Sequence, residues 1–560
     1  MSSRRAVLDA LDRIAFAAEL GGDPRARTWA SAAWAVRSAT GDLAELCASG
    51  ELAKLRGVGP STVRAVEQAL RGETPDALAE LAPQVPEGLF AIRRIEGLGP
   101  KKVRRLWQEL GITSLGELEY ACRENRLVTL SGFGDKTQTK VLDAIERLRE
   151  TEGALRRDQA QAILEPVVHA LHALRCVRRA AIAGDYVRGE ELVRELWVVA
   201  ETDDEEAARA QVDRAQPRER PVALFAAPAA TFCAVLVWRS SEAGHRDALA
   251  ARARERGLAL DERGLFDARG APIACDDEDA VYRALGLVPS APERRLDDAP
   301  LVLEGKASPR LIRREDLRGA LHNHTVASDG RATLEELRDA AAARGLSYLG
   351  VSEHSESAFY ARGLTKERLF EQLTAIDALN LDALSLESGG CVLLSGVESD
   401  ILADGALDYP DEVLRELDVI VASVHRRHGE DPAKMTARMI AAASNPLTDV
   451  IGHPTGRLLL GRAPSAYDVG AFLDACAASG VAVELNANPQ RLDLSAAHLA
   501  MAKERGVLVS IAADAHAVGE LDHLAHGVAV ARRAGLTAED VLNTRTLPEL
   551  RAWLAERRAA

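Results

Sequence analysis

The sequence contains 560 residues, which is too many for one hydrophobic core, so several domains are expected. Its formal net charge of −15 excludes a protein that coats nucleic acid indiscriminately, although a local basic patch can still bind a strand. No apolar run is long enough to span a bilayer and the seven cysteines have no paired spacing, so we expect a cytoplasmic protein with reduced cysteines and no membrane partner.

The N-terminal quarter of the chain contains an internal repeat. Its three copies are LRGVGPSTVRAVEQAL at 55–70, IEGLGPKKVRRLWQEL at 95–110 and LSGFGDKTQTKVLDAI at 130–145. In each copy a helix with polar or basic residues is expected to begin just after a Gly-x-Gly sequence. The glycines permit a tight hairpin, and free N–H groups at the helix start can bind a phosphate. A single copy is more simply a turn between helices, but three copies favour a binding function.

The repeat resembles the helix-hairpin-helix motif, which implies contacts to the DNA backbone that do not depend on base sequence. The stretch 4–81 resembles the small N-terminal helical domain of family X DNA polymerases, and the second and third copies lie where that family has its fingers. The resemblance implies that the following residues contact DNA: Gly57, Gly59, Gly97, Gly99, Lys101, Lys102, Gly132, Gly134 and Lys136.

Residues 156–290 resemble the palm and thumb of a family X polymerase, chiefly through AIAGDYVRGEE and GHRDALAARARERGLALDERGLFD. Such a polymerase needs three aspartates to hold two Mg²⁺ ions. The corresponding positions in this sequence are Glu195, Trp197 and a position near Ala223. We therefore expect a palm that has lost polymerase activity and serves to present a DNA end to the C-terminal part of the chain.

That C-terminal part alternates predicted strands and helices. The apolar, often β-branched runs that predict buried strands are LRGALHNH, YLGVSEH, CVLLSGVE, DVIVASVH, DVIGHP, VAVELNAN and GVLVSIAADAH. Stretches of helical period lie between them, such as TLEELRDAAAARG, in which Thr333 and Glu336 form a predicted capping box. The alternation fits a closed parallel β/α barrel, in which the carboxyl ends of all strands meet at one mouth.

Nine potential metal ligands stand at or just after these strand ends. They are His322, His324, Asp329, His354, Glu398, His425, His453, Asp514 and His516. Side chains two residues apart on a strand share a face, so the first two histidines can chelate together. Imidazoles with carboxylates suit two or three divalent ions, and a pair of ions supports phosphoester hydrolysis. A lone histidine is more often structural, but nine such residues at strand ends favour a metal centre.

From about Asp316 to the C-terminus these motifs, in this order, resemble the PHP (polymerase and histidinol phosphatase) domain. The resemblance implies a distorted seven-stranded barrel with up to three zinc or manganese ions, and it completes the architecture of a bacterial family X polymerase with a C-terminal PHP domain. It groups the ligands as His322, His324, Glu398 and Asp514; Glu398, His425 and His453; and Asp329, His354 and His516. Many relatives have aspartate where this chain has Glu353, and we expect no ligand to be lost by that difference.

We therefore expect a multidomain α/β protein with five parts. These are an N-terminal helical domain with a helix-hairpin-helix (1–82), a fingers-like domain (83–152), a degenerate palm and thumb (153–288), a linker (289–315) and a PHP barrel (316–560). The last is expected to hold zinc and/or manganese ions.

The expected function is hydrolysis of phosphoesters at DNA ends, gaps or nicks by a monomer, as a 3′–5′ exonuclease or a 3′-end-processing enzyme in repair. Three alternatives remain: a working polymerase with an attached exonuclease, a small-molecule phosphatase of the histidinol phosphate type, and a non-enzymatic DNA-binding scaffold. The missing aspartates argue against the first, and the hairpin repeats argue against the second. The cost of burying charged groups without ions argues against the third.

Overall fold

The structure is a computed structural model that describes residues 4–559 except 96, 124–125, 128–129, 131, 151, 307–308 and 385–389. The chain forms two compact units, Met1–Glu152 and Gly153–Ala560. Among the helices that are described, none combines the length and the apolar character needed to cross a membrane. All seven cysteines are free thiols, and five of them are buried.

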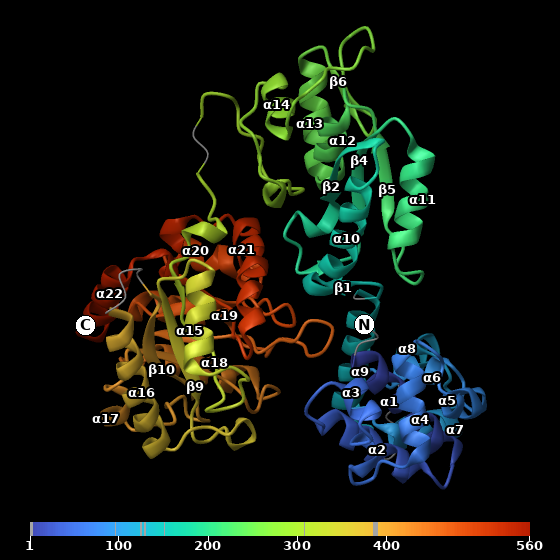
Figure 1. Ribbon diagram of the computed structural model, residues 1–560, viewed down its shortest axis with the longest axis vertical. Coiled ribbons are helices and arrows are strands. Elements are labelled where there is room, and N and C mark those ends of the chain that lie inside the picture. The colour runs from blue at the N-terminus through green and yellow to red at the C-terminus, as the bar shows by residue number, and fades with distance from the viewer. Residues whose placement is uncertain are drawn as a thin grey trace. The chain divides into compact units, whose positions relative to one another are not determined.

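The first unit is helical (Figure 1). Its helices are α1 (Arg4–Gly21), α2 (Ala26–Ser38), α3 (Leu43–Ala48), η1 (Leu52–Lys54), α4 (Pro60–Leu70), α5 (Asp76–Leu81), η2 (Ala82–Gln84), α6 (Gly88–Ile92), α7 (Pro100–Leu110), α8 (Leu115–Arg123) and α9 (Asp135–Glu150). In α1 the buried Val7, Leu11 and Ile14 recur at helical spacing, which makes one face of this helix apolar. One hydrophobic core runs from that face to Ile145 of α9.

The three repeats have the same backbone geometry. Gly57, Gly97 and Gly132 have φ values of 93°, 82° and 84°, in the left-handed region that glycine reaches without a steric penalty. The second glycine of each pair comes directly before the first residue of α4, α7 or α9. The predicted hairpins that lead into new helices are therefore confirmed.

The second unit begins with a three-stranded sheet of order β2-β4-β5, in which β2 and β4 are antiparallel and β4 and β5 parallel. Its elements are β1 (Leu155–Arg156), α10 (Arg157–His172), β2 (Val177–Ala183), η4 (Gly184–Tyr186), β3 (Leu192–Val193), β4 (Trp197–Thr202), α11 (Glu205–Ala215) and β5 (Ala223–Ala227). Apolar residues of α10 and α11 pack with residues of β4 and β5 in one core. The sheet is thus covered by helices that belong to the same stretch of chain.

A smaller lobe follows the sheet. It consists of α12 (Phe232–Arg239), α13 (Ala243–Glu255), β6 (Ala259–Asp261), β7 (Gly264–Phe266), α14 (Glu278–Ala284), η5 (Pro292–Arg294) and η6 (Arg314–Asp316). Arg295, just after η5, is buried and pairs with Glu278 at 2.6 Å. Arg532 pairs with Glu293 of η5, also at 2.6 Å, so this stretch is bound to the domain that follows.

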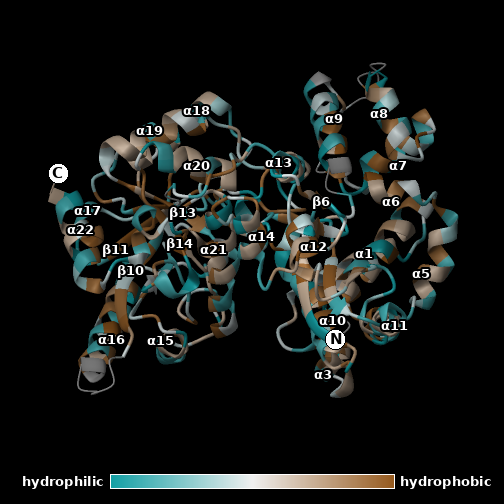
Figure 2. Ribbon diagram, turned by 90° about the horizontal axis from the view of Figure 1, so that it is seen from above, coloured by the Kyte–Doolittle hydropathy of each residue, from teal (hydrophilic) through white to brown (hydrophobic). Residues whose placement is uncertain are grey.

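The C-terminal domain is a barrel of seven parallel strands in the order β14-β13-β12-β11-β10-β9-β8. Its elements are β8 (Gly319–Ala320), α15 (Leu334–Ala343), β9 (Tyr348–His354), η7 (Phe359–Ala361), α16 (Lys366–Leu384), β10 (Val392–Asp400), α17 (Asp411–Leu414), β11 (Val419–Ser423), α18 (Pro432–Ala443), β12 (Val450–Gly452), α19 (Val469–Ser479), β13 (Ala482–Asn486), α20 (Ala496–Glu504), β14 (Val509–Ala512), η8 (Val518–His523), α21 (Leu524–Arg533), η9 (Ala538–Asp540), η10 (Leu542–Thr544) and α22 (Leu547–Ala559). Figure 2 shows hydrophobic residues concentrated on strands such as β10 and β11.

The barrel is nearly closed. Just beyond the ends of β8 and β14, the N–H of His324 donates to the carbonyl of Ala515 at 2.9 Å, and the N–H of Asp514 donates to the carbonyl of His322 at 3.1 Å. Helix α15 begins with the predicted capping box of Thr333 and Glu336. The predicted fold class, a multidomain α/β chain with a seven-stranded C-terminal barrel, is confirmed. The closure brings the first and last strands together at the mouth.

Candidate metal centre

All nine predicted ligands lie at the carboxyl ends of the barrel strands. His322 and His324 follow β8, Asp329 lies in the loop beyond them, His354 ends β9, Glu398 lies on β10, His425 and His453 follow β11 and β12, and Asp514 and His516 follow β14. The parallel order of the strands brings these segments to one mouth, although almost 200 residues separate His322 from His516.

Glu398 occupies the middle of this cluster and is 1% exposed. Its Oε1 lies 2.8 Å from Nε2 of His453, 3.1 Å from Nε2 of His425 and 3.4 Å from Nε2 of His322. Its Oε2 lies 2.9 Å from Nδ1 of His354 and 3.7 Å from Nε2 of His324. One buried carboxylate thus faces five imidazoles, so it can bridge more than one cation.

Two further carboxylates extend the cluster. Oδ1 of Asp514 lies 3.2 Å from Nε2 of His324. Asp329 approaches Nε2 of His516 at 3.3 Å and Nε2 of His354 at 3.5 Å. Among the described residues, three groups have ligand atoms within 4.8 Å of one another: His324, Asp329, His354 and His516; His322, His324 and Asp514; and His354, Glu398 and His425. His324 and His354 each belong to two groups, a sharing that the sequence did not reveal.

The donor set fits divalent cations. Nε2 of His322, both ring nitrogens of His324, and Nδ1 of His354 and of His453 are buried and make no hydrogen bond of good geometry to any described residue. Buried polar atoms are costly when they are unpaired, and imidazole nitrogens facing carboxylate oxygens are the ligands that zinc and manganese accept. The residues present could therefore hold such ions.

The histidines of the cluster differ in pKa: some are raised above the usual value and others are lowered. Burial opposes protonation of His354, but the carboxylates of Glu398 and Asp329 outweigh it and raise the pKa of His354 to about 10. Burial and the nearby ring of His354 lower the pKa of His324 to about 4, and burial beside Arg491 lowers the pKa of His453 to about 3. The pKa of Glu398 is held well below its usual value because His425 and His322 outweigh the effect of burial. The central carboxylate therefore stays ionised and His324 and His453 stay neutral, whereas His354 is protonated without an ion and must release its proton when one binds.

Two further acids, Glu484 and Asp400, contact three of the nine residues from behind. Oε1 of Glu484 lies 2.8 Å from Nδ1 of His322, and its other oxygen accepts from the N–H of His453. Oδ1 of Asp400 lies 2.6 Å from Nδ1 of His425. Such contacts fix the tautomer and the ring direction of a ligating histidine. Sequence reasoning missed both acids, although Glu484 stands in the predicted strand VAVELNAN and Asp400 shares a strand face with Glu398.

Glu353 has a different role from its neighbour His354. It is buried, and it accepts hydrogen bonds from the N–H of Thr325 at 3.0 Å and from Nε2 of Gln372 at 2.9 Å. It also accepts from the hydroxyls of Thr325 and Ser328. Successive residues of a strand point to opposite faces, so Glu353 holds the loop before Asp329 while His354 faces the cluster.

The backbone is strained at two of the nine positions. His453 has a φ of 25° and Asp514 a φ of 49°. Positive φ is uncommon for residues other than glycine and gathers at functional sites, where the surrounding structure holds it. At Asp514 the side-chain amide of Asn486 donates to Oδ2 at 3.0 Å and helps to fix the carboxylate.

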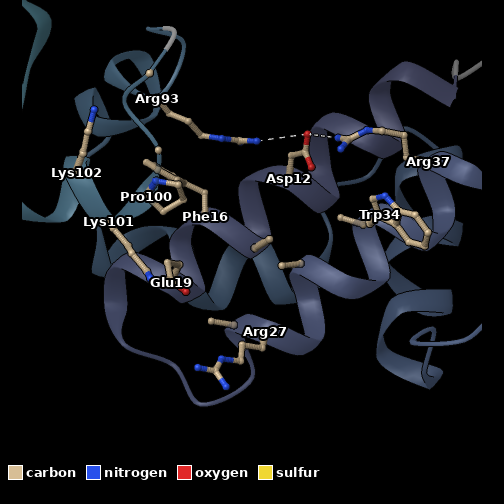
Figure 3. Close-up of a pocket in the computed structure, with 16 residues that line it drawn as sticks. Asp12, Phe16, Glu19, Arg27, Trp34, Arg37, Arg93, Pro100, Lys101 and Lys102 are labelled. Atoms are coloured by element: carbon tan, nitrogen blue, oxygen red, sulfur yellow. Dashed lines mark hydrogen bonds and ion pairs between the residues drawn. The ribbon is translucent and has the colours of Figure 1, made fainter. Parts of the chain in front are cut away.

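The hairpin residues of the first unit lie beside a pocket of about 720 Å³ (Figure 3). Gly97, Gly99, Lys101 and Lys102 line it together with Ala15, Phe16, Arg27, Trp34 and Arg93. Asp12 joins the two sides of the pocket, because its Oδ2 lies 2.6 Å from Arg37 and 3.3 Å from Arg93. The hairpin thus contributes basic side chains to a hollow with an apolar floor. Gly57, Gly59, Gly132, Gly134 and Lys136 do not line this pocket.

By resemblance to family X polymerases, aspartates are expected at positions 195, 197 and 223. This chain has Glu195, Trp197 and Ala223 there. Trp197 begins β4 and pairs in register with Ala223 of β5. The ring of Trp197 packs edge-on against Phe225 at 5.4 Å, and the guanidinium of Arg239 lies 3.9 Å over Phe225. Glu195, the remaining carboxylate, accepts a hydrogen bond from Arg188 at 2.8 Å. The three positions therefore hold a glutamate paired with arginine, a tryptophan packed against Phe225, and an alanine.

Comparison with known proteins agrees with this architecture. The family description "SAM-like Helix-hairpin-helix tandem" matches residues 89–147, and "DNA polymerase beta thumb" matches residues 234–296. A protein of Bacillus subtilis (strain 168) named "DNA polymerase/3'-5' exonuclease PolX" is 30% identical over 573 aligned positions, which cover 98% of this chain and 99% of that protein. The chain belongs to the PolX family.

The barrel of this PolX family member also has shorter relatives. A "Probable phosphatase" of Thermoanaerobacter sp. (strain X514) is 28% identical over 251 positions, covering 42% of this chain and 94% of that protein. A "Probable phosphatase" of Syntrophotalea carbinolica is 28% identical over 237 positions, covering 40% of this chain and 91% of that protein. The resemblance to a bacterial family X polymerase with a C-terminal PHP domain is confirmed.

Proposed function

We propose that this PolX family member is a metal-dependent DNA phosphoesterase that acts on 3′ ends, as a 3′–5′ exonuclease or a 3′-end-processing enzyme in DNA repair. The observation that carries the proposal is Glu398, a buried carboxylate that five imidazoles face at the barrel mouth. The name of the B. subtilis relative, which includes a 3′-5′ exonuclease, supports it.

The nine residues would hold two or three zinc and/or manganese ions. When bound, such ions activate a water and stabilise the charge that develops on a phosphoryl group. The chain itself supplies the geometry for this chemistry. His322 and His425 keep their rings directed because Glu484 and Asp400 hold the opposite nitrogens.

DNA would reach this centre through contacts to its backbone. The hairpin glycines directly precede helix starts, where backbone N–H groups can bind a phosphate, and Lys101, Lys102 and Lys136 can neutralise phosphates. These contacts do not read base sequence, so ends, gaps or nicks of any sequence would serve as substrates. The protein would act as a monomer. Its domains would be the N-terminal helical domain, the fingers-like domain, the palm and thumb, the linker and the barrel, at 1–82, 83–152, 153–288, 289–315 and 316–560.

The palm would not polymerise. The side chains of Trp197 and Ala223 offer no oxygen to a cation, and Arg188 already pairs with Glu195. Two divalent ions need several carboxylates around them. The test is primer extension on a gapped template with Mg²⁺ or Mn²⁺. Template-directed incorporation that a Glu195→Gln change abolishes would overturn this part of the proposal.

The main experiment uses DNA labelled at its 5′ end, incubated with the purified protein in Mn²⁺, in Zn²⁺ and in EDTA. We expect stepwise shortening from the 3′ end with either ion, none in EDTA, and none with the His324→Ala variant. A small phosphomonoester assayed in parallel tests the phosphatase alternative. A higher kcat/KM for that small ester than for DNA ends would favour a phosphatase and contradict the proposal.

A further inference from the structure

The rim of the metal centre carries exposed apolar side chains. Phe359 and Tyr360 on η7, shortly after His354 in the chain, are 75% and 56% exposed. Val326 and Val518, each two residues beyond a histidine of the cluster, are also exposed. Large apolar side chains that gather at an open surface mark a binding site. Here Tyr360 lies beside His354 and His425, which face the mouth, and Phe359 lies next to Tyr360.

The geometry joins these aromatic rings to the centre. The ring of Tyr360 lies 6.3 Å from the ring of His354 and 6.3 Å from the ring of His425. The ring of Phe359 stands nearly perpendicular to that of Tyr360, with the centroids 6.2 Å apart. The guanidinium of Arg426 lies 4.8 Å over the Phe359 ring and donates to the carbonyl of Ser357. Two ring surfaces and one fixed positive charge therefore border the mouth.

The position of this rim limits what can bind there. A protein or a lipid surface seated on Tyr360 would also cover His354 and His425, and so would close the centre to its substrate. The occupant is therefore part of the substrate. Nucleobases stack on exposed aromatic rings without regard to sequence, and a nearby arginine can neutralise the phosphate that follows.

We propose that Phe359, Tyr360 and Arg426 form a stacking platform for the terminal base of a single-stranded DNA 3′ end, while the adjacent phosphodiester lies at the metal centre. The inference rests on the proposed function and specifies the substrate of that site. A base that is paired in a duplex must leave its stack to reach the platform, which costs free energy. Unpaired or frayed ends are therefore the preferred substrates, and an end without a terminal base is a poor one.

The first test measures stacking directly. The full-length, metal-loaded protein is titrated into a single-stranded oligonucleotide that carries 2-aminopurine at its 3′ end and a terminal linkage resistant to hydrolysis. Stacking on a ring quenches 2-aminopurine fluorescence, so we expect quenching by the wild type and little by the Phe359→Ala/Tyr360→Ala variant. Phe370→Ala, which removes an exposed phenylalanine from α16, is the matched control and should quench like the wild type. Equal quenching by the wild type and the double variant would overturn the platform.

The second test compares the wild type and the Phe359→Ala/Tyr360→Ala variant on two substrates that differ at the 3′-terminal base. Hydrolysis is followed on oligonucleotides whose 3′-terminal nucleotide is either normal or abasic. The wild type should lose roughly 10-fold or more in kcat/KM on the abasic end, since a stacked base contributes about that factor or more. The double variant should treat both ends alike, because the two changes remove the same contact. If the variant still discriminates as the wild type does, the platform is wrong. If the wild type hydrolyses neither end, the proposed function is wrong, and the fluorescence test still decides the platform.

Discussion

The sheet β2-β4-β5, which the resemblance assigns to the palm, and the C-terminal barrel both place side chains at strand ends, but with opposite results. In the barrel, Glu398 on β10 faces five imidazoles and is fully buried among polar groups. In the palm, the first residue of β4 is Trp197, which packs against Phe225 below a guanidinium. A residue near the carboxyl end of β10 thus belongs to a candidate centre for cations, whereas the first residue of β4 belongs to an aromatic contact. The chemistry follows the side chains and not the fold.

The two regions also differ in what they contribute to stability. Buried carboxylates and imidazoles cost free energy unless they are paired or bind ions. The stability of the barrel mouth should therefore depend on bound ions. The aromatic stack in the palm is favourable by itself, because ring pairs and cation–π contacts add to burial. One region is therefore built for function at some cost to stability, whereas the other is built for stability. The following changes test that difference.

The largest effect is expected for Glu398→Gln in the barrel. The amide keeps the shape of the side chain but loses the charge that five imidazoles face. We expect 3′-end hydrolysis to fall by more than roughly 100-fold, because a lost ligand should cost more than the 10- to 100-fold typical of a lost supporting contact. Glu195→Gln is the matched change in the palm and should leave hydrolysis unchanged. Steady-state rates, together with metal content by mass spectrometry, give the measurement. A larger loss for Glu195→Gln would reverse the assignment of the two regions.

Removal of metal should lower the stability of the barrel and leave the stability of the sheet that contains β4 unchanged. An ion that binds only the folded barrel stabilises it by about 4 kcal/mol when present at 1,000 times its Kd. Hydrogen exchange of peptides from β10 (Val392–Asp400) should therefore speed up in EDTA. Peptides from β4 (Trp197–Thr202) should exchange at the same rate with and without Mn²⁺. Equal responses in the two strands would mean that the palm also binds cations.

A smaller effect is expected at the supporting acids. Glu484→Gln keeps a hydrogen bond to His322 but weakens its hold on that ring, so metal affinity should fall by roughly 10- to 100-fold. Asp400→Asn should act in the same way on His425. Glu504→Gln on the exposed face of α20 is the control and should bind metal normally. Calorimetric titration of the metal-depleted protein gives the affinities. An unchanged affinity in Glu484→Gln would show that His322 is oriented by the barrel alone.

The sequence predicted the nine residues of the centre because strand ends converge in any parallel barrel. The grouping that the resemblance implied did not include the sharing of His324 and His354 between two groups, because that depends on distances that only the folded loops set. Glu484 was missed because an acid within a buried strand gives no sign of which face it occupies. The hairpins were predictable from their glycines, since the left-handed backbone strongly favours that residue.

Long-range packing explains the other features that the sequence did not reveal. The pocket beside the second hairpin depends on Trp34 of α2, which is far from Gly97 and Gly99 in sequence. The palm positions Trp197 and Ala223 were found by resemblance, but the guanidinium that covers the stack comes from Arg239 of α12. No local pattern connects such residues, because only the tertiary fold brings their elements together.

The smallest effect on hydrolysis is expected for Trp197→Leu in the palm. Leucine keeps much of the buried area but loses the edge-on contact with Phe225 and the cation–π contact with Arg239, which together are worth roughly 1–2 kcal/mol. Unfolding of the palm should therefore need less denaturant, while the rate of 3′-end hydrolysis per folded molecule stays the same. Trp34→Leu removes a tryptophan that is 68% exposed in the first unit, and it should not change stability.

The Trp197→Leu variant distinguishes a purely structural role of the aromatic contact from an effect of that contact on the metal centre. If the palm is only a structural partner of the barrel, loss of its aromatic stack lowers stability and leaves the chemistry intact. If Trp197→Leu instead lowers hydrolysis as strongly as Glu398→Gln does, the stack must act on the centre through the contacts that join the domains. Glu191 provides one such contact, because its carboxylate pairs with Arg457 at 2.7 Å, close in sequence to His453. A Glu191→Gln variant would then reproduce the loss, whereas in the structural case it changes the hydrolysis rate little.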